Sequence, residues 1–265
     1  MRRRAALLAP LALALGASRC NQRGPSEESE VTVYAAASLQ TAFTDLARAF
    51  ERMNAGTRVR LAFAGSQELR VQLEHGARAD VFASADMRVM NALIAAGRAR
   101  HAEVFAHNAL VIVVSPKSRV PLRRFEDLAL APRLSLAAPE VPIGHYSEEV
   151  LTRAERKLGS DFHGRVLAHV VSRELSVSQV LAKVMLGEVD AGIVYASDAK
   201  AAGTRVLTRR IPPQYNVRAD YPVTVLNAAP HPELAHRFVD SLAADAGRDA
   251  LLAAGLSLPE AHPAP

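Results

Sequence analysis

Two hydrophobic patterns alternate along the chain. In residues 31–36 apolar positions alternate with polar ones, which is typical of a half-buried strand, whereas residues 39–50 repeat apolar positions at helical spacing. The same succession recurs through residues 59–116 and again through residues 134–255. Strands that alternate with helices are typical of α/β folds with a mainly parallel sheet. The pattern therefore predicts an α/β protein.

The predicted elements fall into two series, which favours two α/β lobes. We expect lobe 1 to comprise residues 31–112 and 218–260, and lobe 2 to comprise residues 113–217, so that the chain crosses twice between them. The predicted strands are 59–64, 79–86, 109–116, 134–139, 165–171, 190–199 and 221–226, and the predicted helices are 39–50, 67–76, 87–97, 141–159, 176–188 and 232–255.

The N-terminal segment has the pattern of an export signal. Residues 1–19 combine an arginine-rich start with an apolar run of 13 residues, which is shorter than the ~20 residues of a membrane-spanning helix. A buried N-terminal helix is the alternative. Residues 20–30 are polar and predict a flexible leader. We therefore expect a periplasmic or otherwise extracytoplasmic protein.

Cys20 is the only cysteine, so no disulfide within the chain and no cysteine-based zinc site is expected. Its place directly after the apolar run resembles the lipid-modified cysteine of bacterial lipoproteins. Arg19 departs from that pattern, which usually has a small residue there. Lipidation of Cys20 and ordinary signal cleavage nearby both remain open.

Charge argues against nucleic acid as a partner. The chain has a net charge of +5, and four arginines within residues 1–19 account for all but one of these charges. The remaining body is close to neutral, whereas nucleic-acid binding needs a concentrated basic face.

Motifs of common catalytic and cofactor sites are missing from the sequence. It has no phosphate loop, no nucleophile elbow and no zinc-binding histidine pair, and its nine histidines are scattered. We therefore expect no cofactor and no enzyme activity.

Small and hydroxyl residues occupy several predicted corners between a strand and a helix. These are AAASL (35–39), FAGSQEL (63–69), VPIGHY (141–146) and LSVSQVL (175–181). Ligands of open α/β sheets bind at such corners, and helix N-termini offer free N–H groups and partial positive charge. Corners that met in one cleft would suit a deprotonated oxyanion, whereas a carboxylate there would repel it.

These motifs, together with FASAD (82–86) and GIVYASDA (192–199), are similar to those of the periplasmic molybdate-binding proteins of ABC transporters. The resemblance runs from Val31 to the last predicted helix. It implies a two-lobed type II periplasmic-binding-protein fold, in which mainly parallel sheets flanked by helices hold the ligand in the interlobe cleft. It also implies a monomer that captures molybdate or tungstate and delivers it to a membrane permease.

The resemblance further implies which residues bind the oxyanion. Ser38 and Ser66 would offer hydroxyl and backbone N–H groups from one lobe. Ile143 and Val177 would offer backbone N–H groups from the other lobe, and Tyr195 would offer its phenol O–H. The bound metal would have no direct protein ligand. The family often has alanine or another small residue at the position of Ile143, so this larger side chain could alter the shape of the cavity.

Each of these residues also has a purely structural interpretation. Ser38 and Ser66 could be helix N-caps, Ile143 and Val177 could be packing residues, and Tyr195 could be an ordinary half-buried aromatic residue.

Other functions remain open on this fold. The ligand could be another oxyanion such as sulfate or phosphate, or an organic acid bound by an arginine clamp. A secreted enzyme would need a positioned nucleophile or base at the corners. A role in sensing or virulence would use the fold as an interaction module.

Overall fold

The computed structural model describes residues 29–260. The predicted export signal (1–19), Cys20 and all but the last two residues of the predicted leader lie outside the described residues. The first strand begins at Ser29, two residues earlier than predicted, because the Ser29 N–H donates to the Gly56 carbonyl oxygen (3.1 Å).

Nine strands form one continuous sheet in the described part of the chain, in the order β2-β1-β3-β9-β4-β7-β5-β6, with β8 beside β4. β1 pairs in parallel with β2 and β3, and β5 pairs in parallel with β6 and β7. β4 and β9 add antiparallel pairs in the middle. The strands are β1 (Ser29–Ala36), β2 (Thr57–Ala64), β3 (Val81–Ala83), β4 (Glu103–Val114), β5 (Leu134–Ala137), β6 (Val170–Glu174), β7 (Ala191–Tyr195), β8 (Leu207–Arg210) and β9 (Arg218–Val225).

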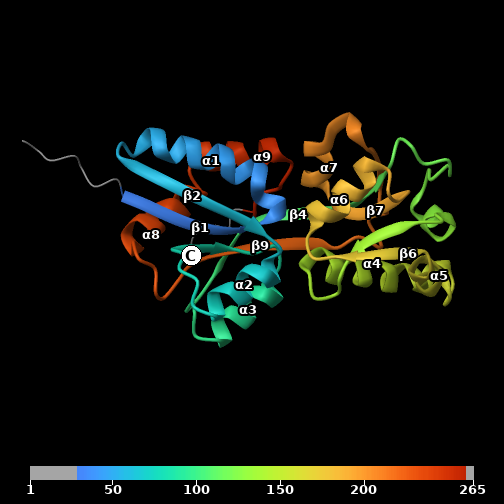
Figure 1. The fold of residues 1–265 in the computed structure, drawn as a ribbon, viewed down its shortest axis with the longest axis horizontal. Coiled ribbons are helices and arrows are strands. Elements are labelled where there is room, and N and C mark those ends of the chain that lie inside the picture. Colours follow the sequence, from blue (N-terminus) through green and yellow to red (C-terminus); the bar gives the residue numbers. More distant parts are fainter. Residues whose placement is uncertain (1–28, 261–265) are drawn as a thin grey trace, which may run out of the picture.

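Helices cover both faces of the sheet in each half of the elongated molecule (Figure 1). In one half α1 and α9 lie on one face and α2 and α3 on the other, and in the second half α6 and α7 lie opposite α4 and α5. The α/β class is confirmed. The helices are α1 (Gln40–Met53), α2 (Ser66–Glu74), α3 (Met87–Ala95), α4 (Pro142–Leu158), α5 (Phe162–Ala168), α6 (Val177–Leu186), α7 (Ala196–Ala202), α8 (Pro232–Asp240) and α9 (Asp245–Ala254), with short 3-10 turns at Ala37–Leu39, Phe125–Leu130 and Gly203–Arg205.

β4 joins the two halves of the molecule. Its first part, residues 103–109, pairs with β9, and its second part, residues 110–114, pairs with β7. Each half also has an aromatic cluster. Phe238 packs on Phe50 in the first half with ring centroids 5.4 Å apart, and Phe125 packs on Phe162 in the second half at 5.5 Å.

Several predicted bounds differ from the structure, as in β4, which begins at Glu103 and not at residue 109, and in three places the kind or number of elements differs. The strand predicted at residues 165–171 begins only at Val170, because Phe162 and Val166 face the core at helical spacing and belong to α5. The strand predicted to run to residue 199 ends at Tyr195, where α7 begins.

The helix predicted at 232–255 is two helices, α8 and α9, separated by a turn. α9 returns so closely that a Cβ on Gly247 would lie 2.1 Å from the carbonyl oxygen of Ser241.

Candidate functional site

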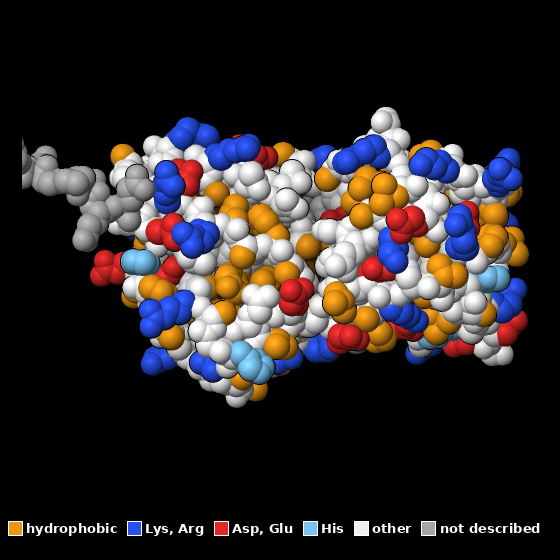
Figure 2. Space-filling view, in the orientation of Figure 1, with side chains coloured by type: hydrophobic (Ala, Val, Ile, Leu, Met, Phe, Trp, Pro, Cys, Tyr) orange, Lys and Arg blue, Asp and Glu red, His pale blue; other side chains and the backbone are white. Residues whose placement is uncertain are grey.

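One small pocket lies where the two halves meet, and all five predicted site residues line it. Its volume is about 10 Å³, so its walls are close together. In the space-filling view the two halves touch along much of their boundary (Figure 2). The lining residues come from the ends of six strands and the turns or helices that follow them: Ala36, Ala37, Ser38, Ala64, Gly65, Ser66, Ala85, Val141, Pro142, Ile143, Val177 and Tyr195.

Four helices begin at this pocket, and Tyr195 directly precedes the first residue of one of them, α7. Ser66 is the first residue of α2, Ile143 is the second residue of α4, and Val177 is the first residue of α6. N–H groups in the first turn of a helix have no acceptor within the helix, and the helix dipole makes that end partly positive. The pocket is therefore surrounded by the ends of helices that favour an anion.

The hydroxyl groups of Ser38 and Ser66 are not helix caps. Ser38 lies in the 3-10 turn before α1, and its Oγ is 2.8 Å from the Oη of Tyr221. The Oγ of Ser66 accepts a hydrogen bond from the Ala85 N–H (3.0 Å), and no side chain caps α1 or α2. Ser66 accepts through a lone pair, so its hydrogen remains available to a ligand.

Tyr195 is only 1% exposed, so it is not half buried, and it lines the pocket at the start of α7. Its Oη is one of the few buried side-chain polar atoms without a hydrogen-bond partner in the described structure. Burial, and then the nearby Tyr221 and Tyr146, raise the pKa of the Tyr195 phenol well above its ordinary value, so that it keeps its proton. The Tyr195 hydroxyl can therefore donate a hydrogen bond to a ligand in the pocket.

The side chains of Ile143 and Val177 are buried, at 1% and 4% exposure, and pack in the core. Packing does not exclude a ligand role, because the proposed donors are their backbone N–H groups. None of the residues that line the pocket carries a charge, and the described residues contain no cluster of His, Cys, Asp and Glu able to hold a metal ion.

Two side chains bridge the halves beside the pocket, and sequence analysis missed both. Gln67 Nε2 of α2 donates to the Leu175 carbonyl oxygen (2.8 Å), and an Arg88 Nη2 of α3 donates to the Glu140 carbonyl oxygen (2.9 Å). Each carbonyl lies shortly before one of the helix starts at the pocket. A Cβ on Gly65 would lie 2.4 Å from the same Leu175 oxygen, so this approach requires glycine.

The sequence also gave no indication of a role for Asn108 and Tyr221. They lie on β4 and β9, the two strands between the halves, and connect the Ser38 hydroxyl to α7 through hydrogen bonds. Their positions in ordinary strand patterns give no signal in the sequence, because the contacts join residues more than 80 positions apart.

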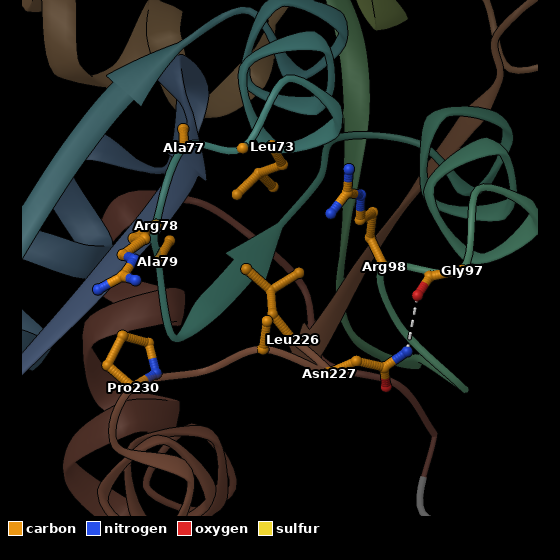
Figure 3. Close-up of a pocket in the computed structure, with 11 residues that line it drawn as sticks. Leu73, Ala77, Arg78, Ala79, Gly97, Arg98, Leu226, Asn227 and Pro230 are labelled. Carbon is orange, nitrogen blue, oxygen red and sulfur yellow. Dashed lines mark hydrogen bonds between the residues drawn. The ribbon is translucent and has the colours of Figure 1, made fainter.

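Figure 3 shows another pocket, of about 400 Å³, which contains none of the predicted site residues. Leu73 and Leu226 point into it, and Arg78 and Arg98 lie at its edge. A guanidinium nitrogen of Arg98 already donates to the Glu74 carbonyl oxygen (2.6 Å), at the end of α2. We therefore assign the candidate site to the small pocket between the halves.

No helix among the described residues is long and apolar enough to cross a membrane.

Comparison with known proteins agrees with this architecture. The family model described as "Bacterial extracellular solute-binding protein" matches residues 31–257. The molybdate-binding protein ModA of Mycobacterium tuberculosis is 40% identical over 89% of this chain and 88% of its own length.

Two solved structures have the same fold. The periplasmic molybdate-binding protein of Azotobacter vinelandii superposes with a TM-score of 0.75 at 22% identity, over 87% of this chain and all of that chain. The sulfate-binding protein SubI of Mycobacterium tuberculosis gives a TM-score of 0.76 at 19% identity, over 88% of each chain. The predicted periplasmic-binding-protein fold is confirmed, and the chain belongs to the family of bacterial extracellular solute-binding proteins.

Proposed function

We propose that this protein captures molybdate, and also tungstate, outside the cytoplasm and delivers it to the membrane permease of an ABC transporter. The observation that carries the proposal is the buried Tyr195 Oη, which has no partner in the described structure and lines a pocket together with Ser38 and Ser66. The 40% identical relative that is named molybdate-binding supports the same ligand.

The mechanism is capture by closure. Residues 31–112 and 218–260 form one lobe in this proposal, residues 113–217 form the other, and β4 and β9 act as the hinge between them. Ser38 and Ser66 bind the ion from the first lobe, and the N–H groups of Ile143 and Val177 and the hydroxyl of Tyr195 bind it from the second. Closure buries the ion and presents one surface to the permease.

A pocket that offers only hydrogen-bond donors would select among oxyanions by whether they carry a proton. Molybdate at neutral pH only accepts hydrogen bonds, whereas phosphate retains at least one proton, which needs an acceptor. A proton without an acceptor in a buried site costs about 1–3 kcal/mol. Hydrogen bonds to a charged group contribute about 1.5–3 kcal/mol each, so about five to seven of them support tight binding after the cost of closure.

Sulfate is the second candidate, because it has the same charge and shape and because a sulfate-binding protein shares the fold. Discrimination against sulfate depends on the size of the cavity, which the Ile143 side chain helps to shape.

A panel of anions tests the proposal. We expect molybdate and tungstate to raise the melting temperature of the protein, and sulfate and phosphate at equal concentration to leave it nearly unchanged. A rise with sulfate alone would establish the second candidate instead.

Calorimetry on Ser38→Ala/Ser66→Ala tests the site. We expect a loss of affinity of at least about 100-fold, because two donors to a charged ion are removed. Ser241→Ala is the matched control, since its buried hydroxyl donates to the Phe238 carbonyl oxygen (2.6 Å) away from the pocket. Unchanged affinity in the double variant would rule out this pocket as the binding site.

The proposal has three further parts. An export signal in residues 1–19 would direct the chain out of the cytoplasm, lipid on Cys20 would tether it to a membrane, and it would act as a monomer. Metabolic labelling with a radioactive fatty acid, compared between the full chain and Cys20→Ser, tests the tether.

A further inference from the structure

Four buried polar side chains form a chain of hydrogen bonds from the pocket through the middle of the molecule. The Ser38 Oγ is 2.8 Å from the Tyr221 Oη, and Asn108 Nδ2 donates to the Tyr221 Oη (3.3 Å) and to the Ser197 Oγ (2.8 Å). All four residues are at most 7% exposed. Every hydrogen in this chain therefore has its direction set by protein groups and not by bulk water.

The amide of Asn108 determines which groups donate and which accept along this chain of hydrogen bonds. Its Oδ1 accepts the Ala109 N–H at 3.0 Å, so the opposite side of the amide, the NH₂ group, faces Tyr221 and Ser197. An amide NH₂ only donates, and the Tyr221 Oη must accept from it.

Tyr221 in turn determines the orientation of the Ser38 hydroxyl. Its Oη accepts from Asn108, so its own hydrogen points to the other neighbour, the Ser38 Oγ. Burial raises the pKa of the Tyr221 phenol well above its ordinary value, so the hydrogen stays in place. The Ser38 hydroxyl then accepts from Tyr221 and has its hydrogen free for the pocket that it lines.

We propose that Asn108 and Tyr221 are positioning residues that orient the Ser38 hydroxyl as a donor toward the pocket and thereby make the pocket disfavour oxyanions that carry a proton. The inference rests on the proposed function and deepens it, because it assigns selectivity against hydrogen phosphate to residues that do not line the pocket. Tyr221 also packs edge-on against Tyr195, with ring centroids 5.6 Å apart, so one residue holds two of the proposed donors in place.

The substitution Asn108→Asp reverses the chain with little change in shape. A carboxylate only accepts, so it takes the hydrogen of Tyr221, Tyr221 takes the hydrogen of Ser38, and Ser38 presents a lone pair to the pocket. The carboxylate still accepts the Ala109 N–H and gains the hydroxyl donors of Tyr221 and Ser197, which keep it ionised. The pocket would then accept one hydrogen bond from a protonated ligand.

The test compares monohydrogen phosphate with sulfate, by competition against molybdate at mildly alkaline pH. These two anions have the same double charge and similar size, and they differ in the proton. The added charge in Asn108→Asp weakens both alike, so the ratio of phosphate affinity to sulfate affinity reports only the direction of the Ser38 hydroxyl. We expect this ratio to rise at least about tenfold, and molybdate affinity to fall by a similar factor.

Tyr221→Phe gives an independent measurement if the buried carboxylate prevents folding. It removes the donor to Ser38 and leaves that hydroxyl free to donate or accept, so the ratio should rise about threefold or more. The matched controls are Asn216→Asp and Tyr215→Phe, which make the same chemical changes outside the chain of hydrogen bonds and should keep the wild-type ratio.

Two outcomes separate failure of the inference from failure of the function. A wild-type ratio in the folded variants, with tight molybdate binding by the wild type, overturns the inference and leaves the proposed function intact. A wild type that does not bind molybdate overturns the proposed function itself.

Discussion

The hydroxyl of Tyr195 is buried among residues 29–260 without a hydrogen-bond partner. A buried polar atom in this condition costs about 1–3 kcal/mol of folding free energy. The hydroxyl lines the pocket, so an anion bound there would supply the missing acceptor and offset this cost. Affinity and stability therefore respond in opposite directions when the hydroxyl is removed.

For Tyr195→Phe we expect molybdate affinity to fall about 10-fold to 100-fold, because one hydrogen bond to a charged ion is lost. The melting temperature without ligand should stay the same or rise, since an unpaired polar atom leaves the core. Calorimetry and thermal unfolding measure the two effects. A fall in both would show that the hydroxyl serves the fold and not a ligand.

The sequence predicted the five residues that line the pocket, but not the hydrogen bonds that support them. Ser38, Ser66, Ile143, Val177 and Tyr195 follow local motifs, and the structure brings all five to one pocket. Their roles as ligands stay predictions. The contacts of Asn108 and Tyr221 depend on strand pairing in three dimensions, which local patterns do not specify.

The start of α7 combines a site residue with a buried acid. The Asp198 carboxylate accepts the N–H of Tyr195 at 3.2 Å and lies in the first helical turn. Burial raises the pKa of Asp198 to about 7 from its ordinary 3.8. In the folded protein the group is therefore protonated over a range of pH in which the unfolded chain has already ionised.

Between about pH 4 and pH 7 the folded protein holds a proton that the unfolded chain has lost, so stability falls as the pH rises through this window. Asp198→Asn keeps an acceptor for Tyr195 but cannot ionise. We expect it to be about 2–4 kcal/mol more stable than the wild type above pH 7 and nearly equal at pH 4, in urea unfolding. A difference that does not change with pH would contradict this assignment.

Most elements were predictable from their pattern, and the exceptions have physical causes. α4 and α6 follow clear helical periodicity and begin within a residue of their predicted starts. The error at residues 165–168 arose because Val166 and Leu167 at the end of α5 lie close to Val170 and Val171 of β6, and together they resemble one apolar strand. β8, with exposed residues at both ends, has no hydrophobic signal of its own and is defined by its pairing with β4.

Gln67 and Arg88 connect the two halves of the molecule beside the pocket. Their hydrogen bonds end on the carbonyl oxygens of Leu175 and Glu140, which precede α6 and α4. Contacts that exist only when the halves meet stabilise the closed arrangement and leave the separate lobes unchanged. They should therefore govern release of the ligand more than its capture.

We expect Gln67→Ala to speed molybdate release about fivefold, with association nearly unchanged, since one hydrogen bond of about 1 kcal/mol is lost. Arg88→Ala should act in the same direction but less, because its side chain is 47% exposed. Stopped-flow kinetics measures both rates. Gln72→Ala, on the exposed face of the same helix, is the control. Release at the wild-type rate in Gln67→Ala would show that this contact does not hold the halves together.

The absence of charged side chains from the lining of the pocket has a consequence for the protein as a carrier. None of the lining residues can take up a proton when a dianion binds, so each loaded molecule would be two elementary charges more negative than an empty one. Loaded and empty forms should migrate differently in a native gel. We expect a receptor in the membrane to experience this difference in charge as either form comes close to it.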